Sequence, residues 1–153
     1  MSKKIFFSPA KINIFLEVLS RRNDGFHNLN SLMSFCTIGD FIEIKKSKKF
    51  SFDIIGPFSK NLLKAKNNII LDVIKKLETH LNRTFNISLK LKKNLPISSG
   101  LGGGSSNAET TIKALIEIFN LKIKENELQK ILLSSGSDVP FCYLGKTYLV
   151  NGI

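Results

Sequence analysis

The sequence predicts an α+β protein in which a mostly antiparallel sheet has helices packed on one face. Two observations point to this fold class. Several short segments alternate apolar and polar residues, as half-buried strands do, and other segments repeat apolar residues at helical spacing. The strand-like segments come first and the helices are interspersed without strict βαβ alternation, which argues against a parallel sheet. A chain of 153 residues fits one domain.

The first strands are expected in the N-terminal third of the chain. Apolar residues alternate over residues 12–18, and this places Lys11 and Asn13 together on the opposite face of the strand. After a polar loop at residues 21–28, strand-like runs follow at residues 29–38, 41–45 and 50–55. Gly39-Asp40 is predicted to turn the chain between the first two of these runs.

Helical periodicity begins near residue 68. Residues 68–81 place their apolar side chains on one helical face, and Asn67 or Asn68 is available as the N-cap. The remaining predicted elements are a strand at 85–91, a helix at 108–119, a short helix near 128–132 and a last strand at 147–150. Gly136 is expected to stop the short helix.

The composition excludes several classes of protein. Hydrophobic residues make up 42% and charged residues 23% of the chain, which is typical of a folded globular protein and not of a disordered one. No apolar run approaches the roughly 20 residues of a membrane helix, and the N-terminus lacks the apolar core of a signal peptide. Cys36 and Cys142 form no disulfide or metal-binding pattern. We therefore expect a cytoplasmic protein with reduced thiols, no membrane partner and no resident metal site.

The net charge of +11 permits an acidic partner but does not identify one. The chain holds 20 lysines and 3 arginines, and the lysines are scattered, whereas a nucleic-acid surface usually recruits arginine for bidentate contacts. A solvated surface is the favoured interpretation, and nucleic acid is not the expected partner. A basic nucleic-acid-binding module stays an alternative.

A glycine-rich stretch between a predicted strand and a predicted helix is the strongest functional signal. Residues 98–106 contain four glycines and four serines. Glycines let backbone N–H groups approach an anion, and the first turn of the following helix adds free N–H groups and its dipole. The stretch lacks the Gly-Lys-Ser/Thr of a Walker A loop, and Ser105 breaks the dinucleotide-binding pattern. A phosphate-binding loop is favoured over a flexible turn.

Three other segments carry candidate site residues, each with a simpler structural alternative. Lys11 and Asn13 are suited to line a site, or they form the wet face of a strand. Asp138 follows a Gly/Ser turn, where an aspartate is usually a turn or cap residue but can also face a cleft. Phe26 and His27 follow the turn signal Asp24-Gly25 and have the side chains needed to stack on a ring and to hydrogen-bond with it.

Taken together and in this order, the four segments resemble one family, the 4-diphosphocytidyl-2-C-methyl-D-erythritol kinases of the GHMP kinase superfamily. The matching motifs are Ser8-Pro-Ala-Lys-Ile-Asn13, Asp24-Gly-Phe-His27, Pro96 to Ala108 and Ser137-Asp-Val-Pro-Phe141. The resemblance implies ATP-dependent phosphorylation of the 2-hydroxyl of the methylerythritol unit, a step in non-mevalonate isoprenoid precursor synthesis. It implies ATP as co-substrate with Mg²⁺ on its phosphates, and a small cytidine-diphosphate substrate.

The resemblance also implies roles for particular residues. Lys11 and Asp138 match the catalytic pair, and Asn68 matches a position near the adenine. Asn13, Phe26 and His27 match substrate-binding positions, with His27 facing the cytosine. The ATP-phosphate loop corresponds to Pro96, Ile97, Ser98, Ser99, Gly100, Leu101, Gly102, Gly103, Gly104, Ser105 and Ser106. In such a site a carboxylate orients the attacking hydroxyl and accepts its proton, and a lysine neutralises charge on the transferred phosphoryl group.

The chain departs from the family pattern in three respects. Phe26 stands where the family usually has tyrosine, and Asn67 replaces the usual aspartate. Residues 1–153 correspond to the N-terminal, ATP-binding domain alone, so a separate C-terminal domain or chain is the expected partner. The alternative within enzymes is another GHMP kinase, acting on homoserine, mevalonate or a sugar.

Overall fold

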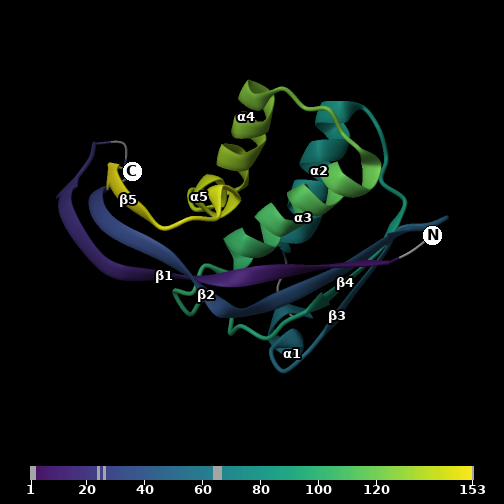
Figure 1. Cartoon of the computed structure of the whole chain (residues 1–153), viewed down its shortest axis with the longest axis horizontal. Helices are drawn as coiled ribbons and strands as arrows, with labels where there is room; N and C mark the ends of the chain where they lie inside the picture. Colours follow the sequence, from purple (N-terminus) through teal and green to yellow (C-terminus); the bar gives the residue numbers. More distant parts are fainter. Residues whose placement is uncertain (1–2, 24, 26, 64–66, 153) are drawn as a thin grey trace.

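The computed structural model describes residues 3–23, 25, 27–63 and 67–152. Within these residues the chain forms a five-stranded sheet with helices packed mainly on one side of it (Figure 1). The strands are β1 (Lys4–Arg21), β2 (His27–Lys46), β3 (Ser51–Ile55), β4 (Ile87–Lys92) and β5 (Tyr148–Gly152). The helices are α1 (Ser59–Leu63), α2 (Ile69–Leu81), α3 (Gly103–Phe119), α4 (Glu125–Ser135) and α5 (Val139–Leu144).

The sheet is mostly antiparallel, which confirms the predicted fold class. The strand order is β1-β2-β4-β3, and β5 pairs with β2. The pairings of β2 with β1, β4 and β5 are all antiparallel, and only β3 and β4 run parallel. Figure 1 shows α2, α3, α4 and α5 on one side of the sheet and the short helix α1 on the other, beside β3.

The predicted turn at Gly39-Asp40 is wrong, because β2 runs unbroken through both residues. The strand pairing shifts there instead: Pro9 pairs with Gly39, whereas Lys11 pairs with Phe35. A Cβ atom at Gly39 would lie 2.2 Å from the Ser8 carbonyl oxygen. Glycine therefore allows the close approach of two strands at an irregularity in the pairing, a use that sequence alone does not distinguish from a turn.

The core lies between the sheet and its covering helices. The predicted face of α2 is confirmed, since Ile70, Val73, Ile74 and Leu77 are buried. They pack in one cluster with alternate residues of β2 and β4 and with apolar residues of α3 and α4. Asn68 is the N-cap of α2, and its side chain accepts a hydrogen bond from the Ile70 N–H at 2.9 Å. This packing holds the N-terminal ends of α2 and α3 against the sheet.

In the alternating segment of β1, the apolar side chains are exposed and the lysine is buried, the reverse of the usual arrangement. Lys11 is only 6% exposed, whereas Ile12, Ile14, Leu16 and Val18 are between 36% and 60% exposed. Lys11 therefore points into the protein, whereas these four apolar side chains are largely uncovered in the described structure. The strand pairing shifts between Asn13 and Phe15, so the apolar residues before and after this point lie on different faces of the sheet. Exposed apolar side chains that lie together on one strand are typical of a contact surface.

Two short helices were not predicted from the sequence. α1 has five residues and α5 has six, too few to show a helical period. Pro140 in the first turn of α5 suits a helix start, where its missing N–H costs nothing. None of the helices in the described part of the chain is long and apolar enough to cross a membrane.

Candidate active site

The glycine-rich stretch forms the first turn of α3 and the loop that leads into it. Helix α3 begins at Gly103, with Gly102 as its N-cap in the left-handed region at φ 62°. The N–H groups of Gly103, Gly104 and Ser105 belong to the first turn, where N–H groups have no partner within the helix. The Ser106 N–H is already bound to the Gly102 carbonyl at 2.9 Å. Three backbone donors and the positive end of a 17-residue helix thus meet at the predicted phosphate loop.

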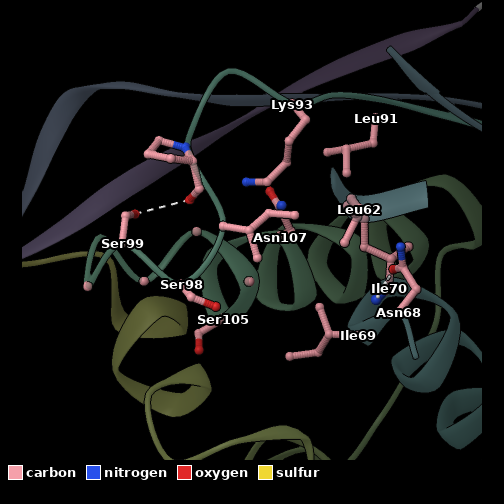
Figure 2. A pocket seen from close by; sticks show the side chains of 16 residues that line it. Leu62, Asn68, Ile69, Ile70, Leu91, Lys93, Ser98, Ser99, Ser105 and Asn107 are labelled. Atoms are coloured by element: carbon pink, nitrogen blue, oxygen red, sulfur yellow. Dashed lines mark hydrogen bonds between the residues drawn. The ribbon is translucent and has the colours of Figure 1, made fainter. Parts of the chain in front are cut away.

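A pocket opens over this helix start and extends to the N-cap of α2 (Figure 2). Its two ends differ in chemistry. Ser98, Ser99 and Ser105 lie at one end, and Asn68 lies at the other end with Leu62 and Ile69. The N-cap bond occupies Oδ1 of Asn68, which leaves its amide group as a donor. The pocket therefore offers a polar end rich in N–H and hydroxyl groups and an end suited to a planar apolar ring.

Most of the predicted ATP-binding residues line this pocket, and two do not. Those that line it are Asn68, Pro96, Ile97, Ser98, Ser99, Gly100, Gly102, Gly103, Gly104 and Ser105. The Leu101 carbonyl accepts a hydrogen bond from the Lys11 N–H at 2.8 Å. Ser106 is fully buried, and its hydroxyl is hydrogen-bonded to the Ser8 hydroxyl, with the two Oγ atoms 3.0 Å apart. Leu101 and Ser106 thus tie the loop and the helix to β1.

Lys11 and Asp138 meet, although they are 127 positions apart (138 − 11). The Lys11 Nζ lies 3.1 Å from an Asp138 carboxylate oxygen and donates a hydrogen bond to the Asn13 Oδ1, also at 3.1 Å. The charged groups of Lys11 and Asp138 thus pair in the structure, whereas their catalytic role stays a prediction. Asp138 is the N-cap residue of α5 but makes no side-chain cap bond, so its carboxylate is directed to Lys11 and not to the helix. The backbone of Asp138 thus has the predicted cap position, while its side chain is free of the helix and bonded to Lys11.

A second pocket lies on the far side of this ion pair. It is lined by Asp138, His27, Phe141, Met33 and Val18, among others. The Phe141 ring, which lines the pocket, stacks on the Phe35 ring with ring centroids 5.1 Å apart. His27 is the exposed first residue of β2, and Asn13 reaches the site through its bond with Lys11. Phe26 lies outside the described residues.

The ion pair separates the two pockets. Gly102 lines the first pocket, and a Cβ atom placed on it would lie 3.0 Å from the Lys11 Cβ and Cε. Asp138 lines the second pocket and is bonded to the same lysine. Lys11 thus lies between Gly102, which lines the first pocket, and Asp138, which lines the second.

Sequence reasoning missed two charged residues at the first pocket. Lys93 lines the pocket and is 3% exposed, and Asp40 lies behind it, fully buried. The Lys93 Nζ and the Asp40 Oδ2 are 2.5 Å apart. Lys92-Lys93 is one of several lysine pairs, and Asp40 follows a glycine, so a solvated surface and a turn were the natural interpretations. The alternation of β4 is the one signal that puts Lys93 on the buried side, two residues beyond Leu91.

A further buried group lies where α3 meets α5. Glu109 is 4% exposed, its carboxylate pairs with the Lys113 Nζ at 2.7 Å, and burial raises its pKa above the ordinary value. Burial also raises the pKa of the Cys142 thiol to about 12, so this cysteine is protonated and unreactive at neutral pH. In the residues that the structure describes, no group of three His, Cys, Asp or Glu side chains is arranged to hold a metal ion.

The glycine cradle, the helix start and the lysine–carboxylate pair thus lie together in one region of the structure. The family model for the GHMP kinases N terminal domain matches residues 68–146. The chain belongs to this family. Individual relatives are similar to the chain over nearly its whole length. The chain is 38% identical over 148 residues to a 4-diphosphocytidyl-2-C-methyl-D-erythritol kinase of Chelativorans sp. (strain BNC1), a match that covers 95% of this chain and 50% of the relative.

Other comparisons agree in fold and extent. A second such kinase, from Buchnera aphidicola subsp. Acyrthosiphon pisum, is 40% identical over 152 residues, with 95% of this chain and 53% of the relative covered. A crystal structure of a 4-(cytidine 5'-diphospho)-2C-methyl-D-erythritol kinase matches with a TM-score of 0.80 at 26% identity, covering 97% of this chain and 52% of that one. A Streptococcus pneumoniae phosphomevalonate kinase shares the fold, with a TM-score of 0.67 at 18% identity. The chain spans about half the length of the relatives that it matches.

Proposed function

We propose that this chain is the nucleotide-binding part of a kinase that transfers the γ-phosphoryl group of ATP to the 2-hydroxyl of 4-diphosphocytidyl-2-C-methyl-D-erythritol. The observation that carries the proposal is the Lys11–Asp138 pair, 3.1 Å apart and bordered by the two pockets. The similarity to curated kinases of this substrate favours it over other GHMP kinase substrates.

The first pocket suits ATP. The free N–H groups at the start of α3 and the serines near them would bind the phosphates. At the other end, Leu62 and Ile69 would contact the two faces or the edge of the adenine, and the Asn68 amide would donate to it. Mg²⁺ would accompany ATP, held mainly by phosphate oxygens and neutralising their charge.

The ion pair suits the chemistry of transfer to an alcohol. The Asp138 carboxylate lines the second pocket with 34% of its side chain exposed, so it can accept the proton of a bound hydroxyl. The Lys11 ammonium is almost fully buried, and a buried cation interacts strongly with charge that develops on the transferred phosphoryl group. Phosphoryl transfer has a loose transition state, so positioning and charge stabilisation supply most of the catalysis.

The second pocket would hold the cytidine-diphosphate substrate, with His27 and Phe26 beside the cytosine and Asn13 beside the Lys11 ammonium. A C-terminal half, present in the same polypeptide or as a separate chain, would complete the wall of this pocket. The shared length of about half of each relative supports this proposal.

The test is a phosphoryl-transfer assay with ATP, Mg²⁺ and the cytidine substrate, run with the chain alone and with the separately expressed C-terminal half of a relative. Homoserine, mevalonate and a sugar serve as competing acceptors. Lys11→Met should lower kcat by about 10²- to 10³-fold, as losing one donor to a developing charge does, and Asp138→Asn by about 10²- to 10⁴-fold. Transfer to another acceptor, or full transfer by the Asp138→Asn chain, would contradict the proposal.

A further inference from the structure

Asp40 is a buried carboxylate with every acceptor position in use. It is fully buried in β2. Its Oδ1 accepts hydrogen bonds from the N–H groups of Asn94 at 2.7 Å and Leu95 at 2.8 Å. Its Oδ2 accepts from the Lys93 Nζ at 2.5 Å and from the Asn107 Nδ2 at 2.9 Å. An ionised carboxylate offers about four lone-pair sites, so this one is saturated.

The four donors come from the two ends of the glycine loop. Residues 93–95 connect the end of β4 to the loop, and Asn107 lies in α3, just after the glycines and serines. The Asn107 Oδ1 in turn accepts a hydrogen bond from the Ser8 Oγ at 2.7 Å. Ser8 lies on β1 three residues before Lys11. One buried carboxylate thus joins the strand that enters the loop, the helix that leaves it and, through Asn107, the strand that carries the lysine.

Asp40 acts on the nucleotide pocket only through its partners. It does not line that pocket, whereas Lys93, Asn107 and the glycines between them do. A Cβ atom at Gly103 would lie 3.1 Å from the Lys93 Nζ, so the position of this lysine limits the space beneath the first turn of α3. Any shift of Asp40 would therefore be passed to both sides of the loop.

We propose that Asp40 is a positioning residue that sets the spacing between the start of the glycine loop and the first turn of α3, and so the geometry of the N–H groups aimed at the phosphates. The consequence for nucleotide binding rests on the proposed function. Stability alone does not explain a carboxylate here, because a buried ion pair is often no more stable than an apolar pair of the same volume. What an apolar pair lacks is the set of four directed bonds.

The first test compares Asp40→Asn with a matched control, Glu78→Ala. The asparagine amide would present donors to the Lys93 ammonium and the Asn107 amide, which breaks two of the four bonds. Glu78 accepts a hydrogen bond from the Phe85 N–H at 2.7 Å, so its loss also removes a side-chain acceptor from a backbone N–H, but away from the loop. We expect ATP with Mg²⁺ to bind Asp40→Asn at least about tenfold more weakly, the equivalent of one unsatisfied buried group, and Glu78→Ala within about twofold of the unchanged chain.

Amide hydrogen exchange separates positioning from a general loss of stability. In Asp40→Asn the amides of residues 93–95 and of Ser106, which are hydrogen-bonded in the structure, should exchange faster, with the amides of α2 unchanged. Faster exchange throughout the chain would overturn the proposal. It would also be overturned if ATP affinity fell in Asp40→Asn and in Glu78→Ala only as far as the melting temperature of each variant fell. If the unchanged chain fails to bind ATP, the proposed function fails, and the exchange pattern still decides whether Asp40 positions the loop.

A second comparison applies if Asp40→Asn does not fold because it leaves the Lys93 charge buried alone. It sets the double variant Lys93→Met, Asp40→Asn against the double variant Lys93→Met, Asp40→Ala, so that neither chain contains a buried charge at these two positions. The alanine chain lacks an acceptor for the N–H groups of Asn94 and Leu95, and we expect these amides to exchange at least about tenfold faster than in the asparagine chain. Equal exchange in the two chains would show that Asp40 serves only to balance the charge of Lys93.

Discussion

Replacing Gly102 with alanine should displace the Lys11 side chain. Gly102 has φ of 62°, in the region that side chains rarely adopt, and an added Cβ would lie 3.0 Å from both the Cβ and the Cε of Lys11. Gly100 offers a matched control, because its φ is 78° and an added Cβ there would meet nothing within 4 Å. The two substitutions share the backbone strain, and only one of them adds a contact with Lys11.

The sizes of the two effects follow from these contacts. A left-handed conformation costs a non-glycine residue about 1–2 kcal/mol, so Gly100→Ala should lower the free energy of unfolding by that amount. The Lys11 backbone is held by its N–H bond to Leu101 and by pairing with β2, so the lysine Cβ cannot move freely. Overpacking of this kind adds about 1–3 kcal/mol, which corresponds to a further fall of about 2–12 °C in melting temperature for a chain of this size.

Thermal unfolding without nucleotide measures the difference, since both glycines line the pocket that we propose for ATP. NMR of the Lys11 ammonium, or a crystal structure, then reports its distance from Asp138. We expect the 3.1 Å pair to be lengthened in Gly102→Ala and retained in Gly100→Ala. Equal melting temperatures for the two variants, with the pair intact in both, would refute the reasoning.

Four further predictions concern the pockets, a buried carboxyl and the surface. Gly103→Val should weaken ATP binding at least about tenfold by calorimetry, because even a Cβ there lies 3.1 Å from the Lys93 Nζ; unchanged affinity would remove the loop from phosphate binding. His27→Ala should weaken binding of the cytidine substrate much more than binding of ATP, because only the former loses a ring contact, and equal losses would make His27 structural. Burial raises the pKa of Glu109, so the folded chain binds this proton more tightly than the unfolded chain, and the free energy of unfolding should fall as pH rises through the raised pKa. Urea titrations over a range of pH should show a smaller fall for Glu109→Gln, and identical pH profiles for the two chains would contradict the prediction. The chain alone should self-associate through the exposed apolar residues of β1, among which Ile14 is 60% exposed. Sedimentation should show less association for Ile14→Ser, and a monomeric unchanged chain at high concentration would exclude this contact.

Local pattern determined much of the fold and the glycine loop. The alternation in β1, β3 and β4 and the periodicity of α2 and α3 are short-range properties, so their elements appear near the predicted residues. The N-cap at Asn68 and the end of α4 at Gly136 each depend on the type of residue at one position, so both could be predicted from the sequence. A glycine loop before a helix is local in the same sense, because its N–H groups and the helix start are neighbours in the chain.

The long-range contacts were decided only by tertiary structure. Gly39 lies in an unbroken strand because of a close approach to Ser8, 31 positions earlier (39 − 8), and no local pattern reports that contact. Asp40 draws its donors from residues more than 50 positions away, so its burial depends on how β2, β4 and α3 pack. The alternation of β4 could place Lys93 on the buried side of the strand, but it could not show that Lys93 pairs with Asp40. The motifs of Lys11 and Asp138 suggested a catalytic pair, but only the packing of α3 against both α5 and β1 brings the lysine and the carboxylate within 3.1 Å.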